Sequence, residues 1–158
     1  MNNLVIRPAT LEDFDIIDQF QVGLIEFERK FDPSIAPEKE TRYYPRGEIE
    51  GLIRAKSLLV AEIDGKLVGC GFGKVEKVDW AEPRESGYIG FIYVLPEHRG
   101  KGVATAIISK LVEYFKAKGI SLFRIKSYSD NERAINAYKK LGFVPYLTEL
   151  YLKQIHQK

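Results

Sequence analysis

Tyr88-Ile-Gly-Phe-Ile-Tyr-Val-Leu-Pro-Glu-His-Arg-Gly-Lys-Gly-Val-Ala-Thr-Ala-Ile-Ile-Ser-Lys-Leu111 is the stretch of this sequence that determines the predicted fold. Residues 88–94 are rich in aromatic and β-branched side chains, which suit a buried strand. Pro96 ends that strand, because proline cannot donate to a strand ladder. From Val103 onward the apolar residues recur at helical spacing. The stretch therefore predicts a central strand joined to a helix by the turn Arg99-Gly-Lys-Gly102.

This turn is typical of a site that binds an anion. The first N–H groups of a helix have no partner inside it, and the helix dipole adds partial positive charge there. Glycines let a phosphate approach the backbone, and Arg99 and Lys101 supply full charges. The alternative is a plain loop before a solvated helix start. The turn is neither a P-loop nor a dinucleotide fingerprint, since the P-loop string is absent and Gly100-Lys-Gly-Val-Ala-Thr105 lacks the third glycine.

Two motifs together resemble the GNAT family of acetyl-CoA-dependent N-acetyltransferases. Arg99-Gly-Lys-Gly-Val-Ala104, placed after Val94-Leu-Pro-Glu97, resembles the family's Arg/Gln-x-x-Gly-x-Gly/Ala signature. About thirty residues later, Asn131-Glu-Arg-Ala-Ile-Asn-Ala-Tyr-Lys-Lys-Leu-Gly-Phe143 resembles the second motif of the family. In this order and spacing the two motifs are specific, and the resemblance extends over nearly the whole chain.

Length and composition fit a single soluble domain over residues 1–158. The chain is 45% hydrophobic and 29% charged, and its net charge of +2 is too small to imply nucleic acid or an anionic membrane as a partner. No apolar run approaches the roughly 20 residues that span a bilayer. The start of the chain lacks the features of a signal peptide. Cys70, the single cysteine, excludes an internal disulfide and a cysteine-rich metal site, and we expect it to be a small buried residue. These features favour a cytoplasmic protein without a metal.

The element pattern predicts a mixed α/β (α+β) fold with about seven strands and about four helices. Asp64-Gly65, between two apolar runs, is a strong hairpin signal, and the glycines within residues 69–73 indicate either a close backbone approach or a bend inside a strand. Ser129-Asp-Asn-Glu132 is typical of a capping box that starts the last helix. Two final strands are expected to pair around Pro145. The predicted strands are 4–8, 58–63, 66–78, 88–94, 120–126, 143–144 and 148–153, and the predicted helices are 10–27, 47–56, 103–118 and 131–141.

The resemblance implies a mostly antiparallel central sheet whose fourth and fifth strands run parallel and splay apart. Splaying would leave backbone groups on strand 88–94 unpaired, so that the pantetheine arm of CoA can add to it as a strand would. The turn would cradle the pyrophosphate, Asn131 would touch the pantetheine or diphosphate region, and Arg133 or Lys139 would meet the 3′-phosphate. The residues expected to contact the cofactor are Ile92, Tyr93, Val94, Arg99, Gly100, Lys101, Gly102, Val103, Ala104, Asn131 and Ala134.

Tyr138 would be the general acid that protonates the departing CoA sulfur. From the residues alone, Tyr138 is better explained as a core tyrosine and Asn131 could be only a helix-start residue, so both roles rest on the resemblance. Many family members carry a glutamate on the central strand that activates the amine through water, and Gly90 occupies that position here. Deprotonation of the amine must then come from Glu76, Glu82, Glu85, Tyr93 or solvent. Each of these glutamates is more readily explained as a solvated surface charge.

The resemblance implies an acetyl-CoA-dependent N-acetyltransferase that moves the acetyl group to a primary amine of a small molecule or a peptide, by direct attack in a ternary complex. The alternative is a noncatalytic acyl-CoA-binding sensor. A transferase for longer acyl groups would need room beside Phe91 and Tyr93. Arg42-Tyr-Tyr44, Glu26 and Glu28 either shape a pocket for a cationic or aromatic amine or form ordinary surface. A homodimer, common in the family, is left open.

Overall fold

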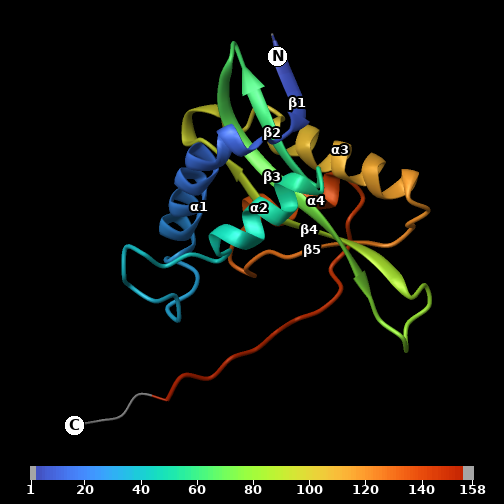
Figure 1. Ribbon diagram of the computed structural model, residues 1–158. Helices are drawn as coiled ribbons and strands as arrows, with labels where there is room; N and C mark the ends of the chain where they lie inside the picture. The colour runs from blue at the N-terminus through green and yellow to red at the C-terminus, as the bar shows by residue number, and fades with distance from the viewer. Residues whose placement is uncertain (1–2, 155–158) are drawn as a thin grey trace.

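A single five-stranded sheet with helices on both faces organises the chain (Figure 1). The structure is a computed structural model that describes residues 3–154. The sheet has the order β1-β2-β3-β4-β5, with antiparallel neighbours except for the parallel pair β4 and β5. The strands are β1 (Leu4–Pro8), β2 (Leu58–Ile63), β3 (Lys66–Lys77), β4 (Glu85–Val94) and β5 (Phe123–Ile125). The α-helices are α1 (Phe14–Glu28), α2 (Arg46–Arg54), α3 (Val103–Ala117) and α4 (Glu132–Lys140).

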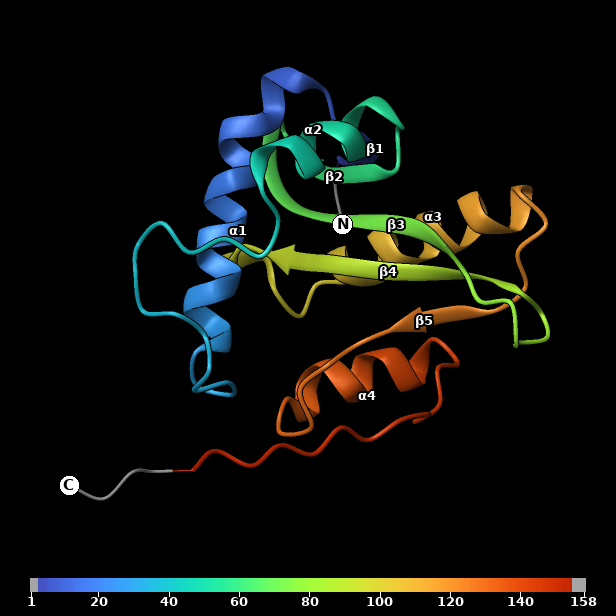
Figure 2. The same cartoon turned by 60° about the horizontal axis from the view of Figure 1, so that its bottom comes forward.

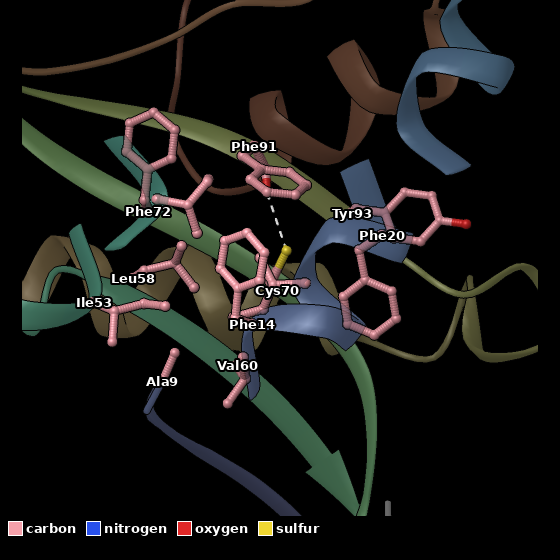
Figure 3. Close-up of a cluster of buried hydrophobic side chains, with 12 residues drawn as sticks. Ala9, Phe14, Phe20, Ile53, Leu58, Val60, Cys70, Phe72, Phe91 and Tyr93 are labelled. Atoms are coloured by element: carbon pink, nitrogen blue, oxygen red, sulfur yellow. Dashed lines mark hydrogen bonds between the residues drawn. The ribbon is translucent and has the colours of Figure 1, made fainter. Parts of the chain in front are cut away.

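The face of the sheet under α1 and α2 carries an aromatic-rich core (Figure 3). Phe14 and Phe20 of α1 meet Phe72 of β3 and Phe91 of β4 around Cys70. The Cys70 thiol is fully buried, lies 3.7 Å from the Phe91 carbonyl oxygen, and has a raised pKa because of this burial. The expectation that Cys70 is a small buried residue is therefore confirmed.

The opposite face packs against α3, and glycines on the strands let the helix come close. A Cβ atom on Gly71 would lie 2.8 Å from the Ile107 side chain, and one on Gly73 would lie 2.6 Å from the Phe115 ring. Such distances leave no room for a side chain. The glycines of β3 thus mark a close approach, as the sequence predicted, and α3 is seated directly over β3 and β4.

A bulge in β4 opens the sheet beside β5. Cys70 pairs with Tyr93 while Phe72 pairs with Gly90, so β4 uses one residue more than β3 between the same two points. Phe91 has a φ of 52°, a left-handed value that is uncommon for a bulky side chain. Pairing with β5 ends at Ile89, immediately before the bulge. Figure 2 shows the two strands together near the start of β4 and apart toward its end, as the splayed arrangement predicted.

The predicted strands 143–144 and 148–153 do not form, so the sheet has five strands instead of seven. Residues 143–154 are extended without strand pairing, and Figure 1 shows this tail running away from the body of the molecule. Leu147 and Leu150 are 82% and 88% exposed. The residue types there suit a strand, but a strand forms only by pairing with a neighbour, and within the described residues the tail pairs with no strand, although β5 has only β4 beside it. The capping box is also wrong: the N-cap of α4 is Asn131, two residues after Ser129, and its side chain accepts from the Ala134 N–H.

Candidate active site

The turn before α3 has the open backbone that an anion site requires. Gly100 and Gly102 have φ values of 73° and 84°, which glycine adopts without strain. The first hydrogen bond of α3 runs from the Ala106 N–H to the Gly102 carbonyl at 3.0 Å, and no side chain caps the helix. Within residues 3–154, the N–H groups of residues 100–104 donate to no protein acceptor. Their orphan donors and the helix dipole therefore face outward together.

Three basic side chains surround this turn, in different ways. Nε of Arg99 donates to the Val94 carbonyl at 2.8 Å, and the guanidinium lies 5.0 Å from the Phe27 ring. Arg99 therefore ties the end of β4 to α1. Nζ of Lys101 donates to the Glu97 carbonyl at 3.0 Å on the surface. Arg133 of α4 places Nη2 3.0 Å from where a Cβ on Gly100 would lie, so α4 brings a cation to the turn.

The last residues of β4 carry the other predicted cofactor contacts. Beyond Ile89 the edge of β4 that faces β5 is unpaired. Ile92 is half-buried toward α3, whereas Tyr93 is buried and its hydroxyl packs on Gly23 of α1. Tyr93 can thus offer a ligand only its backbone. The Val94 carbonyl already accepts from Arg99, which limits its part in holding a pantetheine amide.

Asn131 and Tyr138 are carried by α4, which lies beyond β5 (Figure 2). The Asn131 Oδ1 atom accepts from the Ala134 N–H at 3.2 Å, so both residues take part in the helix cap. Tyr138 is largely buried against Phe143, with ring centroids 6.3 Å apart. Burial, helped by the charges of Glu28 and Tyr88, raises the pKa of Tyr138 to about 12. The phenol therefore keeps its proton at neutral pH, which a general acid requires.

The residues proposed to replace the missing strand glutamate are mostly remote from this region. Glu82 and Glu85 are exposed at the β3–β4 connection, and Glu85 lies 3.5 Å from Lys77. Glu76 is half-buried on β3 and its charge reaches Tyr88. Gly90 itself has no space for a carboxylate, since a Cβ there would lie 2.7 Å from the Phe72 ring.

Two residues that sequence analysis missed tie other segments to α1 and to the residues that follow it. Gln21, buried on α1, donates to the Tyr44 carbonyl at 3.2 Å and accepts from the Tyr44 N–H at 2.6 Å. Its position among the apolar residues of α1 was the available signal. Tyr128, after β5, donates to Asp32 at 2.8 Å and stacks on Phe31. Nothing in the sequence linked Tyr128 to α1, because 96 residues separate it from Asp32.

Arg42 does not contribute to an acceptor site, because Asp18 of α1 binds it in two hydrogen bonds of 2.9 and 3.2 Å. The described helices include none long and apolar enough to cross a membrane. Over the same residues, no three His, Cys, Asp or Glu side chains gather in a way that would hold a metal ion.

A family model and several curated relatives identify the family to which the chain is similar. A protein-family model described as the acetyltransferase (GNAT) family matches residues 22–143. An uncharacterized N-acetyltransferase of Methanocaldococcus jannaschii is 38% identical over 84 residues, which are 53% of this chain and 37% of the relative. Thialysine N-epsilon-acetyltransferase of Mus musculus is 46% identical over 55 residues, 35% of this chain and 32% of the relative. The chain thus spans about a third of the length of these curated relatives.

Solved structures share the fold over nearly the full length. A point mutant of a Bacillus halodurans protein superposes with a TM-score of 0.81 at 20% identity, covering 96% of this chain and 99% of the other. A predicted acetyltransferase from Clostridium acetobutylicum, crystallised with acetyl-CoA, gives a TM-score of 0.70 at 22% identity, covering 95% and 96%. With the family match over most of its length and the GNAT sheet and turn in place, the chain belongs to the GNAT family of acetyltransferases, whose cosubstrate is acetyl-CoA.

Proposed function

We propose that residues 1–158 form one acetyltransferase domain that moves the acetyl group of acetyl-CoA to a primary amine by direct attack in a ternary complex. The open amides of residues 100–104 beside the unpaired end of β4 are the observation that carries this proposal. A diphosphate fits a helix start with free N–H groups, and an amide-bearing arm fits an unpaired strand edge. Acetyl-CoA has both an amide-bearing pantetheine arm and a diphosphate. The arm precedes the diphosphate in the cofactor, as the end of β4 precedes the turn in the chain.

The side chains have separate tasks in this proposal. Arg133 and Lys101 flank the diphosphate, and Arg99 holds the end of β4 in place. Asn131 caps the start of α4, the helix that carries Tyr138. Tyr138 donates its proton to the departing sulfur, since a free thiolate with a pKa near 8.5 is a poorer leaving group than a thiol.

The acyl group is best assigned as acetyl. The rings of Phe91 and Tyr93, where a longer acyl chain would need room, are 4% and 8% exposed. Tyr44 stacks on Phe91 at 5.5 Å, and Phe20 packs on Tyr93 at the same distance. We expect the acceptor to be an amine on a small molecule or a peptide, in the cytoplasm, as the composition favours; the mouse relative is named for acetylating an N-epsilon position.

The experiment is the release of CoA from acetyl-CoA with a panel of amines, comparing the wild type with Tyr138→Phe. We expect turnover with at least one amine and, in the variant, a loss of about 100-fold in kcat. Binding of CoA, measured by calorimetry, should be nearly equal in the two proteins. Tight CoA binding without turnover on any amine would refute the enzyme and favour the noncatalytic acyl-CoA sensor, for which Gly90 is the supporting feature.

We also infer that the chain associates with a second copy of itself through its tail. The tail exposes six large apolar side chains, and β5 has only β4 as a neighbour in the described sheet. An apolar extended segment and an unpaired strand edge are the two halves of a strand-addition contact. The exposed apolar side chains are Val144, Tyr146, Leu147, Leu150, Tyr151 and Leu152.

A further inference from the structure

Glu28 is the last residue of α1 and directly precedes the residues that contact the segment after β5. Phe31 stacks on Tyr128 with centroids 5.9 Å apart, and the Tyr128 hydroxyl donates to Asp32 at 2.8 Å. These contacts hold the end of α1 against the segment that follows β5, so that α1 bridges the two diverging strands. Glu28 is half-buried at this bridge.

Five tyrosines from four parts of the chain lie within the electrostatic influence of Glu28, and we call these residues the tyrosine cluster. Burial raises the pKa of each tyrosine, and the negative charge of Glu28 raises it further in every one. This common influence places the carboxylate within electrostatic reach of them all, including Tyr138, the proposed acid on α4. The cluster consists of Tyr43, Tyr44, Tyr88, Tyr128 and Tyr138.

The Glu28 carboxylate has no cationic partner among the described residues. Its neighbour Glu26 pairs with Arg29 at 3.1 Å on the surface, but Glu28 makes no salt bridge within residues 3–154. The buried Tyr43 hydroxyl makes no hydrogen bond of ordinary geometry to a described residue, yet it lies close enough to Glu28 to stabilise its charge. A half-buried carboxylate without a cation is costly, and it becomes favourable when a cationic ligand arrives.

We propose that Glu28 and the tyrosine cluster form the acceptor site, where Glu28 binds a primary alkylammonium ion and takes its proton. This proposal rests on the proposed function. Aromatic faces and one carboxylate together suit an ammonium group better than a neutral or anionic one. Other charged groups also act on the site. The negative ones are Asp32 near Glu28, Glu48 near Tyr44 and Glu76 near Tyr88, and a positive one is Lys126, whose Nζ lies 5.5 Å from the Tyr88 ring.

The proton balance of the reaction is closed by two residues. An alkylamine, with a pKa near 10.4, arrives protonated and gives one proton to Glu28. The neutral nitrogen attacks the thioester carbonyl carbon, a C–N bond forms, and the C–S bond breaks. Tyr138 protonates the sulfur and regains a proton from the new amide nitrogen. Glu28 then releases its proton to solvent. Burial, opposed by Tyr43 and helped by the charge of Asp32, raises the pKa of Glu28, which makes it a stronger base than a surface carboxylate.

The test compares Glu28→Gln with a matched control, Glu26→Gln on the same helix, and with Glu76→Gln, which removes the competing candidate base on β3. The substrates are 1,5-diaminopentane, which is cationic, and aminoacetonitrile, which is neutral at the assay pH. In Glu28→Gln we expect kcat/KM for the diamine to fall about 100-fold or more, with a much smaller loss for aminoacetonitrile. The exposed Glu26→Gln control should stay within about twofold for both amines, and Glu76→Gln should lose less than Glu28→Gln. Equal losses for the two amines, or the main loss in Glu76→Gln, would overturn the assignment.

Failure of the proposed function is distinguishable from failure of this site. If the wild type transfers acetyl to no amine, the proposed function fails. The site is then decided by calorimetric titration of 1,5-diaminopentane into the CoA-bound protein. Binding that Glu28→Gln weakens about tenfold supports an ammonium site, because losing one charged partner is worth about 1.4 kcal/mol or more. No binding, or equal binding in the variant, overturns it.

Discussion

Replacing Gly100 by alanine should weaken CoA binding as well as the fold, and a matched glycine elsewhere separates the two effects. The φ of 73° at Gly100 costs an alanine about 1–2 kcal/mol. In a chain of this size that cost lowers Tm by about 2–8 °C. The added methyl would also lie 3.0 Å from Nη2 of Arg133 and in front of the free amides. Losing one charge-assisted hydrogen bond to the diphosphate costs about 1.5–3 kcal/mol, which is about a 10- to 100-fold rise in Kd.

The matched control is Gly65→Ala in the β2–β3 hairpin. Gly65 has a φ of 78° and nothing within 4 Å of an added Cβ, so the backbone strain is nearly the same. Thermal unfolding should therefore show similar losses of stability in both variants. Calorimetric titration of CoA should separate them, with wild-type affinity in Gly65→Ala and the loss confined to Gly100→Ala. Equal CoA affinity in the two variants would refute the assignment of the diphosphate to this turn.

Three further predictions concern other parts of the chain. Gly90→Glu places a Cβ 2.7 Å from the Phe72 ring and should lower the free energy of unfolding by about 1–3 kcal/mol in urea; an unchanged midpoint would contradict the packing. Burial raises the pKa of Glu28 in the folded state, so ionisation of Glu28 destabilises the fold as pH rises. Glu28→Gln should therefore have a higher Tm than the wild type at pH 7, and this difference should disappear by about pH 4, where the carboxyl is largely protonated in both states. A lower Tm of the variant at pH 7 would count against a buried charge. Light scattering should find a dimer that Leu150→Asp with Leu152→Asp converts to a monomer, and a monomeric wild type would exclude association through the tail.

The strand, turn and helix of residues 88–111 were predictable because each signal there is local. Aromatic and β-branched residues favour β4, Gly100 and Gly102 supply left-handed backbone, and the apolar spacing after Val103 gives α3 its buried face. The hairpin at Asp64-Gly65 was predictable for the same reason, since both residues have positive φ values.

The features that sequence reasoning missed depend on contacts between distant segments. The bulge at Phe91 follows from pairing with β3, and the position of Tyr128 follows from its stacking on Phe31. The Arg99 side chain was predicted for the diphosphate, yet its Nε bonds the Val94 carbonyl, which no residue pattern encodes. The prediction of two strands in the tail was wrong for a related reason. An alternating pattern shows which residues suit a strand, but it does not show whether a strand edge will pair with them.

Hydrogen–deuterium exchange of the backbone amides of residues 100–104, with and without saturating CoA, tests the central claim most directly. The amides donate to no acceptor in the described chain, so without CoA they should exchange rapidly. With CoA bound we predict strong protection of these amides, while the exposed hairpin amide of Gly65 exchanges at an unchanged rate. CoA that binds and leaves residues 100–104 unprotected would contradict the account.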